Sequence, residues 1–467
     1  MKKTSIALFI GLTGLAGTAL GACGGDDNMG DDDGTDVDAA VNPDATGPQT
    51  IRVNDDITTD TTWEAENTYV LPRLKYVFVK DGATLTIEPG TRILGEQGSV
   101  LVIARGAKIE AAGTAENPIV MTSAQPDGMR TPGFWGGLLV LGAAPINVNV
   151  NSTPPSTEAT FEAFTSAIPE GKFGGTNAAD DSGTLRYVRV EFGGFNFVAD
   201  REFNNITFAG VGSGTEVDYL QSHKGKDDGV EIFGGTLNLK HVVISQAQDD
   251  GLDSDNGWQG KVQFLVIQHV GPDGAADASN GYESDNHGTA ASYTAMPRTR
   301  PTIYNATLVG KADYAVGSGS FATVLRRGTG GAYYNHLILN FPKGLEVRDT
   351  ATGDQLAAGN LFFKNSIFFN NDALGDADNW PAPQAANDID EEAAIMVTAN
   401  MNREADPGMP AAAFNLNNPT FKPTDGSAAL TGGATPPNDG FFDPTATFVG
   451  AVGAIDWTTG WTAYPQN

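Results

Sequence analysis

A pentapeptide that recurs at a fixed interval is the sequence feature that most limits how this chain can fold. DDGVE at residues 227–231 and DDGLD at residues 249–253 are 22 residues apart, and the run TLNLKHVVISQ between them is apolar and rich in β-branched side chains. Turn residues followed by a strand-forming run at this period predict one coil of a stacked β solenoid. Such a fold places the acidic side chains of successive copies on neighbouring coils.

Other segments repeat the pattern of a turn followed by an apolar strand. GATLTI at residues 82–87 and GAKIEA at residues 106–111 are 24 residues apart. Leucine-rich repeats share this period, but leucine does not recur at their consensus positions, and a propeller would need longer units of four strands. We therefore predict an all-β, right-handed parallel β-helix over residues 51–467, with residues 390–401 as the best helix candidate.

Several segments are expected to decorate this β-helix. Lateral loop insertions are predicted at residues 145–182, 271–300 and 371–415. The C-terminal region, from about residue 416 to residue 467, is expected to cap the last coil through Trp457 and Trp461, with exposed sugar-stacking tryptophans as the alternative. Three asparagines at intervals of 30 suggest either an inward ladder between coils or a simple turn preference: Asn305, Asn335 and Asn365.

The N-terminal segment has the composition of an export signal. Lys2 and Lys3 precede a short apolar stretch that ends in Leu20-Gly21-Ala22, directly before Cys23, the single cysteine of the chain. This arrangement resembles the signal and lipobox of a bacterial lipoprotein, which implies cleavage after residue 22 and acylation of Cys23. Residues 23–50, rich in Asp and without Lys or Arg before residue 51, are predicted to be a disordered tether.

Charge and cysteine content limit the classes of binding partner and the sources of stability that this protein can have. The net charge of −29 argues against nucleic acid as a partner, and we expect none. One cysteine excludes an intramolecular disulfide, so the stability of an extracytoplasmic protein has to come from stacked coils and from any bound cations. We expect a membrane-anchored lipoprotein, outer membrane, periplasmic or surface-exposed.

A resemblance to a known family rests on several segments together. Residues 61–95, TTWEAENTYVLPRLKYVFVKDGATLTIEPGTRILG, residues 113–147, the two DDG corners, and FFDPTATFVGAVGAIDWTTGWTAY at residues 441–464 are similar to bacterial surface or secreted lipoproteins with the pectin-lyase-like fold. The resemblance implies the fold and a surface location. It transfers no catalytic residue, because the family is largely uncharacterised biochemically.

Carboxylates crowd the predicted corners. Two full charges about 4.8 Å apart repel by roughly 0.9 kcal/mol in a water-like medium and by about 3.5 kcal/mol at an effective dielectric of 20. Hydrogen bonds from corner amides, a raised pKa or a bound cation would each relieve this repulsion. Because only oxygen ligands are abundant, calcium is the cation expected, and the metal candidates are Glu231, Asp253, Asp255, Glu283 and Asp285.

The alternative is a surface polysaccharide hydrolase or lyase. Its catalytic candidates are Asp227, Asp228, Asp249, Asp250 and His287, in an order comparable to that of polygalacturonases. A lyase would also need a basic residue, for which the nearest in sequence are Lys224, Lys226, Arg298 and Arg300. The main hypothesis is instead a lateral surface for binding, adhesion or scaffolding, with a polysaccharide or a cell-surface molecule as the partner. A concave patch joining the acids to basic or aromatic groups would favour the enzyme, and acids that face corner amides would favour the structural interpretation.

Overall fold

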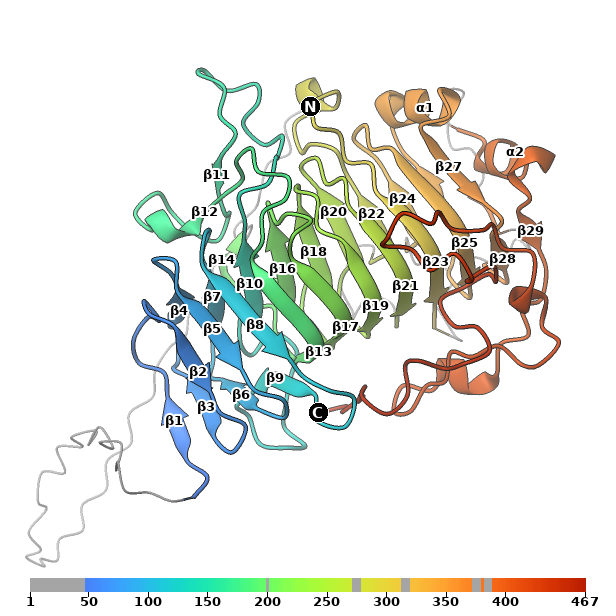
Figure 1. Cartoon of the computed structure of the whole chain (residues 1–467). Helices are drawn as coiled ribbons and strands as arrows, with labels where there is room; N and C mark the ends of the chain where they lie inside the picture. Colours follow the sequence, from blue (N-terminus) through green and yellow to red (C-terminus); the bar gives the residue numbers. More distant parts are fainter. Residues whose placement is uncertain (1–46, 199–200, 271–278, 312–319, 372–378, 382–388) are drawn as a thin grey trace, which may run out of the picture. The chain divides into compact units, whose positions relative to one another are not determined.

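The strands of this protein stack in parallel along one axis. The computed structural model describes residues 47–198, 201–270, 279–311, 320–371, 379–381 and 389–467. Within them, sixteen strands form one sheet, sheet A, and nine form a second, sheet B, and every pairing in both is parallel between successive coils (Figure 1). The prediction of an all-β, right-handed parallel β-helix with lateral insertions is confirmed.

The strands of sheet A are β1 (Thr50–Arg52), β2 (Thr61–Trp63), β3 (Thr68–Leu71), β5 (Thr84–Ile87), β6 (Arg92–Gly95), β8 (Lys108–Ala112), β9 (Ile119–Ser123), β13 (Gly183–Glu191), β17 (Glu216–His223), β19 (Leu239–Ser245), β21 (Lys261–Gln268), β23 (Thr302–Val309), β25 (Gly331–Leu339), β27 (Leu361–Lys364), β28 (Ile367–Phe369) and β29 (Arg403–Glu404). The strands of sheet B are β4 (Tyr76–Val79), β7 (Val100–Ile103), β10 (Leu138–Leu141), β16 (Ile206–Ala209), β18 (Val230–Phe233), β20 (Leu252–Asp255), β22 (Tyr282–Ser284), β24 (Thr323–Leu325) and β26 (Glu346–Val347). Two short antiparallel pairs are β11 (Ala159–Thr160) with β12 (Lys172–Phe173), and β14 (Asn196–Val198) with β15 (Arg201–Glu202).

The DDG repeat leads the chain into sheet B. Its glycines, Gly229 and Gly251, precede β18 and β20, and a Cβ at Gly229 would lie 2.3 Å from the side chain of Ile244. The close approach of this core side chain therefore requires glycine. Because side chains alternate along a strand, Val230 and Ile232 fill the core while Glu231 faces outward.

The long strands of sheet A bend at one residue each. Tyr187, Tyr219, His241 and Phe264 occupy equivalent positions with φ between 48° and 63°, and their rings stack with centroids 4.3, 4.3 and 4.8 Å apart. The same column continues along the helix axis through Asn305, Asn335 and Asn365, with φ between 54° and 58°. The left-handed conformation at each bend is one that asparagine adopts readily, as the turn-preference interpretation expects.

The alternative prediction, that these asparagines form an inward ladder between coils, is wrong. The side-chain amide of Asn305 donates to the carbonyl oxygens of Ala446 and Phe448, and that of Asn335 donates to Ala434. The asparagine side chains therefore bind the C-terminal segment, residues 405–467, and not the asparagines of adjacent coils.

The C-terminal segment runs back along the outside of sheet A (Figure 1). Trp461 lies against Tyr187 and Tyr219, and Trp457 lies against His241. The expectation that the two tryptophans cover the last coil is therefore wrong, because their ring partners belong to middle coils. Trp461 is 2% exposed, so it is also not an exposed sugar-stacking residue.

The last coil is covered by a different segment. Trp380 lies 4.6 Å from the ring of Phe368 in β28, and Ile395 of helix α2 (Glu391–Ile395) joins the same core. Helix α2 and the 3-10 turn Thr398–Asn400 both lie within residues 390–401, where a helix was predicted. The observed helix is shorter than that prediction. Helix α1 (Thr350–Ala357) had no counterpart in the prediction.

The insertions differ in what they build. Residues 145–182 contain the β11–β12 pair, and their Phe161 and Phe164 pack with Phe203 against the outer face of sheet B. Residues 271–300 are not one continuous insertion, because β22 lies within them. Neither helix within the described residues has the length and apolar character of a bilayer span. Cys23, the predicted signal and most of the predicted tether lie outside the described residues.

Candidate acidic site on sheet B

Three acidic residues form a row on the outer face of sheet B. The parallel register places Glu231 of β18 opposite Asp253 of β20, and Asp253 opposite Glu283 of β22. The row borders a cavity of about 440 Å³. Eight carboxylates line this cavity together with Asn280, Arg326 and Arg348: Glu162, Asp227, Asp228, Glu231, Asp249, Asp250, Asp253 and Glu283.

A ladder of side chains at the adjoining corner binds backbone amides. The amide of Asp228 donates to Oδ1 of Asn204 over 3.2 Å, and the amide of Asp250 donates to Oδ1 of Asp228 over 3.0 Å. The ladder continues from Asn280 to Oδ1 of Asp250 over 2.5 Å, and from Phe321 to Oδ1 of Asn280 over 3.0 Å. One oxygen of each aspartate therefore stabilises the stacking of coils, as the structural interpretation expects.

Burial and crowding raise the pKa of six of these carboxyls, namely Asp227, Asp228, Glu231, Asp250, Asp253 and Glu283. Burial, and after it the neighbouring Glu202, raises the pKa of Asp227 to about 8. Burial also raises the pKa of Glu283 to about 7, against the opposing effect of Arg326. For the fully enclosed Asp228 and Asp253, burial and neighbouring carboxylates raise the pKa well above the usual value. Without a cation, these carboxyls release their protons at a higher pH than isolated carboxyls do.

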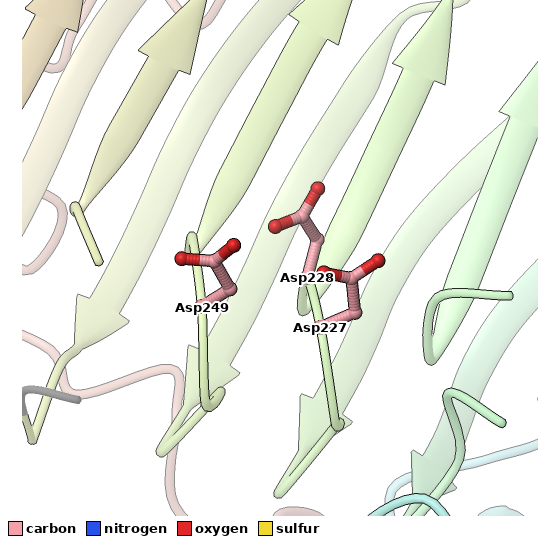
Figure 2. A group of neighbouring side chains, drawn as sticks. All are labelled: Asp227, Asp228 and Asp249. Carbon is pink, nitrogen blue, oxygen red and sulfur yellow. The ribbon is translucent and has the colours of Figure 1, made fainter. Parts of the chain in front are cut away.

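Three overlapping sets of carboxylates could hold a metal ion, each with its ligand atoms within 4.8 Å of one another. They are Asp227, Asp228 and Asp249; Asp228, Glu231 and Asp253; and Asp250, Asp253 and Glu283. Figure 2 shows the first set, in which carboxyls on two neighbouring turns stand close together. All the ligand atoms are oxygen, which suits calcium.

Two of the predicted metal residues belong to none of these sets. Asp285 accepts from Arg326 over 2.9 Å and from Arg327 over 2.6 Å. Asp255 accepts from the amide of Asn256 over 2.5 Å. The structure therefore brings Glu231, Asp253 and Glu283 together, while Asp255 and Asp285 take part in other contacts.

His287 is held away from the cavity. Its Nδ1 accepts from the amide of Thr289 over 3.0 Å, and its Nε2 donates to the carbonyl of Val148 over 3.2 Å. Both ring nitrogens thus join the loop after β22 to the insertion at residues 145–182. His287 is not among the residues that line the cavity.

The basic residues of the site are not those expected from sequence proximity. Arg326 and Arg348 line the cavity, and Arg326 also pairs with Glu283. Lys224 instead donates to the carbonyl of Gln466, and Arg298 donates to Tyr293. Despite the opposing effect of burial, Glu283 and Asp285 raise the pKa of Arg326, so this side chain is a poor proton acceptor.

Some of the missed residues left a signal in the sequence and others did not. Asn280 occupies the second position of SNGYE, where the other copies have Asp228 and Asp250, so an alignment of coils could have found it. Glu162 comes from an insertion without a repeat. Arg326 stands 41 residues after its partner Asp285, an interval that no other copy repeats.

Comparison with known proteins agrees with the architecture. No curated protein matches the chain, and no solved structure matches it. A family model described as a pectate-lyase-like β-helix domain matches residues 55–462, which include every strand from β2 to β29. This chain therefore belongs to the family of pectate-lyase-like β-helix domains.

Proposed function

We propose that this protein is a lipid-anchored, extracytoplasmic β-helix that binds its partner along the lateral face of sheet B. The observation that carries the proposal is the cavity in which eight carboxylates face two guanidinium groups. A calcium ion held there would be the contact point for an anionic group of the partner, such as the carboxylate of a cell-surface polysaccharide. The lipid at Cys23 would keep this face outside the cytoplasm.

The chemistry of the cavity supports a cation as the first ligand. Calcium takes six to eight oxygen ligands in flexible geometry, and three carboxylates supply up to six. Water or oxygen atoms of the partner would complete the shell on the open side. Zinc and copper are poorer fits, because none of the described residues that line the cavity is a histidine or a cysteine.

The test is calcium binding by the purified full chain. Isothermal titration after treatment with chelator should detect binding, and saturating calcium should raise the melting temperature by several degrees, since a ligand at 100 times its dissociation constant adds about 2.7 kcal/mol. The variant Glu231→Gln should reduce both effects. The matched control is Asp354→Asn on the exposed side of α1. Superimposable melting curves with calcium and with chelator would remove the cation from the proposal.

A polysaccharide hydrolase is the second candidate. Its supporting observation is that carboxyls with raised pKa stand within 4.8 Å of others, because retaining hydrolysis needs one protonated and one ionised carboxyl about 5–5.5 Å apart. A polysaccharide panel assayed for reducing ends and unsaturated products decides between the two. Activity that is lost in Asp249→Asn and Asp250→Asn would establish the enzyme, and an inactive panel with intact polysaccharide binding would establish the binding protein.

A further inference from the structure

Two of the three carboxylate sets are one arrangement repeated a coil further along. Asp228, Glu231 and Asp253 form the first, and Asp250, Asp253 and Glu283 form the second. The register places each member of the first set directly beside its counterpart in the second. The two sets are therefore separated by one coil step, about 4.8 Å.

Asp253 belongs to both sets. Its Oδ1 atom is buried, and no group within the described residues donates a hydrogen bond to it. A buried carboxylate oxygen without a donor is rare in folded proteins, because its desolvation is not offset. Asp253 is also the one residue that these two sets share.

We infer that the cavity binds two divalent cations on adjacent coils and that the Asp253 carboxylate bridges them. The inference rests on the proposed function, which requires only that a cation binds. Bridged pairs of divalent ions are stable at separations of about 3.5–4 Å, so one coil step is not too short. The bridging carboxylate screens the repulsion between the ions.

The charge of the cavity favours two ions over one. Eight carboxyls and two guanidinium groups line it, so a lining whose carboxyl protons are all displaced by cations has a formal charge of −6, of which one divalent ion leaves −4 and two leave −2. Neighbouring coils carry this charge along the axis. A single ion on one coil would leave the carboxylates of the next coil uncompensated.

The two positions differ in their affinity for a cation. Glu231 accepts a hydrogen bond from the neutral amide of Asn204, whereas Glu283 accepts one from the cationic Arg326. A cation beside Glu283 is repelled by this guanidinium, so the position at Asp228, Glu231 and Asp253 fills first. The set in Figure 2 is not a third repeat, because the position that follows its Asp249 on the next coil is Ser279, which has no carboxylate.

The experiment measures stoichiometry on the full chain with calcium alone. Equilibrium dialysis and isothermal titration should give two ions per chain, the second at least tenfold weaker. Asp228→Asn and Glu283→Gln should each retain one ion, and Asp253→Asn should weaken both. Asp255→Asn, two residues further along the same strand, is the matched control and should retain two ions.

Each outcome separates the inference from the proposed function. One ion in the unmodified protein, or two in Glu283→Gln, overturns the bridged pair and leaves calcium binding intact. No ion at all overturns both. If Asp253→Asn does not fold by circular dichroism, terbium and europium bound together to the unmodified protein decide: a shortened terbium lifetime supports the pair, and an unchanged lifetime overturns it.

Discussion

A single side chain, Asp227, illustrates how the acidic cavity links the stability of the protein to pH. Burial and the neighbouring Glu202 raise its pKa to about 8, so the folded protein holds a proton there that the unfolded chain releases near pH 4. The stability that this proton contributes is complete below about pH 4 and is lost as the pH rises through about 8. Glu283 and Asp255, each with a pKa raised to about 7, act in the same direction.

We predict that the chelator-treated protein melts at a lower temperature at about pH 8.5 than at about pH 7, since each such group changes the free energy of unfolding by up to about 1.4 kcal/mol per pH unit. Buried histidines oppose this trend only at lower pH. Burial lowers the pKa of His223 to about 3 and that of His269 to about 4, so their contribution is nearly complete above about pH 7.

Asp227→Asn should flatten the pH dependence of the melting temperature, because the amide has no proton to lose. Saturating calcium should flatten it too, since the cation compensates the ionised carboxylates. A melting temperature that stays constant or rises between about pH 7 and about pH 8.5 without calcium would contradict the raised pKa values of the carboxyls in the cavity.

Individual residues of the site were predictable only where they recur at the same position of the repeat. Glu231, Asp253 and Glu283 follow the same glycine in three copies, and the structure places them side by side. The partners of Asp285 were not predictable, because Arg326 and Arg327 come from a later coil at an irregular interval. Nor could the sequence show that both nitrogens of His287 are used in loop contacts.

At the scale of elements, the ladder from Asn204 to Asn280 ties successive turns of sheet B together. Its end is the bond from the amide of Phe321 to Oδ1 of Asn280, a residue that is 2% exposed. Asn280→Ala leaves this buried amide without an acceptor, which costs about 1–3 kcal/mol. We therefore expect a lower midpoint of urea unfolding for Asn280→Ala, and a change within about 0.5 kcal/mol for the exposed control Asn417→Ala. Equal midpoints for the two variants would show that the ladder does not stabilise the coils.

The C-terminal segment offers a second test at this scale. Trp461 packs edge-on against Tyr187 and Tyr219, each with ring centroids 5.8 Å away, and its Nε1 donates to the carbonyl of Trp457. Trp461→Ala should lower the free energy of unfolding by about 3–5 kcal/mol, the usual cost for a buried tryptophan. Ile455→Ala, at a position that is 82% exposed, is the control and should have little effect. A Trp461→Ala protein as stable as this control would mean that the segment is not docked.

Strands and coils were predictable because each repeats a local pattern of turn and apolar run. The path of the C-terminal segment was not, since its contacts join residues far apart in sequence. Gln221, for example, both donates to and accepts from Ala463, 242 residues later. A tryptophan that caps a coil and one that packs along its side have the same local sequence, so only the tertiary contacts distinguish them.

At the scale of the whole molecule, the proposal depends on where the β-helix is held. The predicted tether carries eight Asp between residues 24 and 49 and few apolar residues, so it would remain solvated. About 27 residues reach roughly 90 Å when extended, enough to hold the acidic cavity clear of a membrane surface. One acyl chain gives only reversible binding, so stable anchoring requires the several chains of a processed lipoprotein.

We predict that Cys23→Ser moves the protein from the membrane fraction to the soluble extracytoplasmic fraction, because Cys23 is the single thiol available for acylation. Globomycin should cause the uncleaved precursor of the unmodified chain to accumulate, and labelling with a clickable fatty acid should mark the unmodified chain but not the variant. Asp26→Asn, in the tether, is a control that should leave acylation unchanged. Normal processing in globomycin, or membrane retention of Cys23→Ser, would contradict the anchor while leaving the calcium-binding cavity to be judged on its own titration.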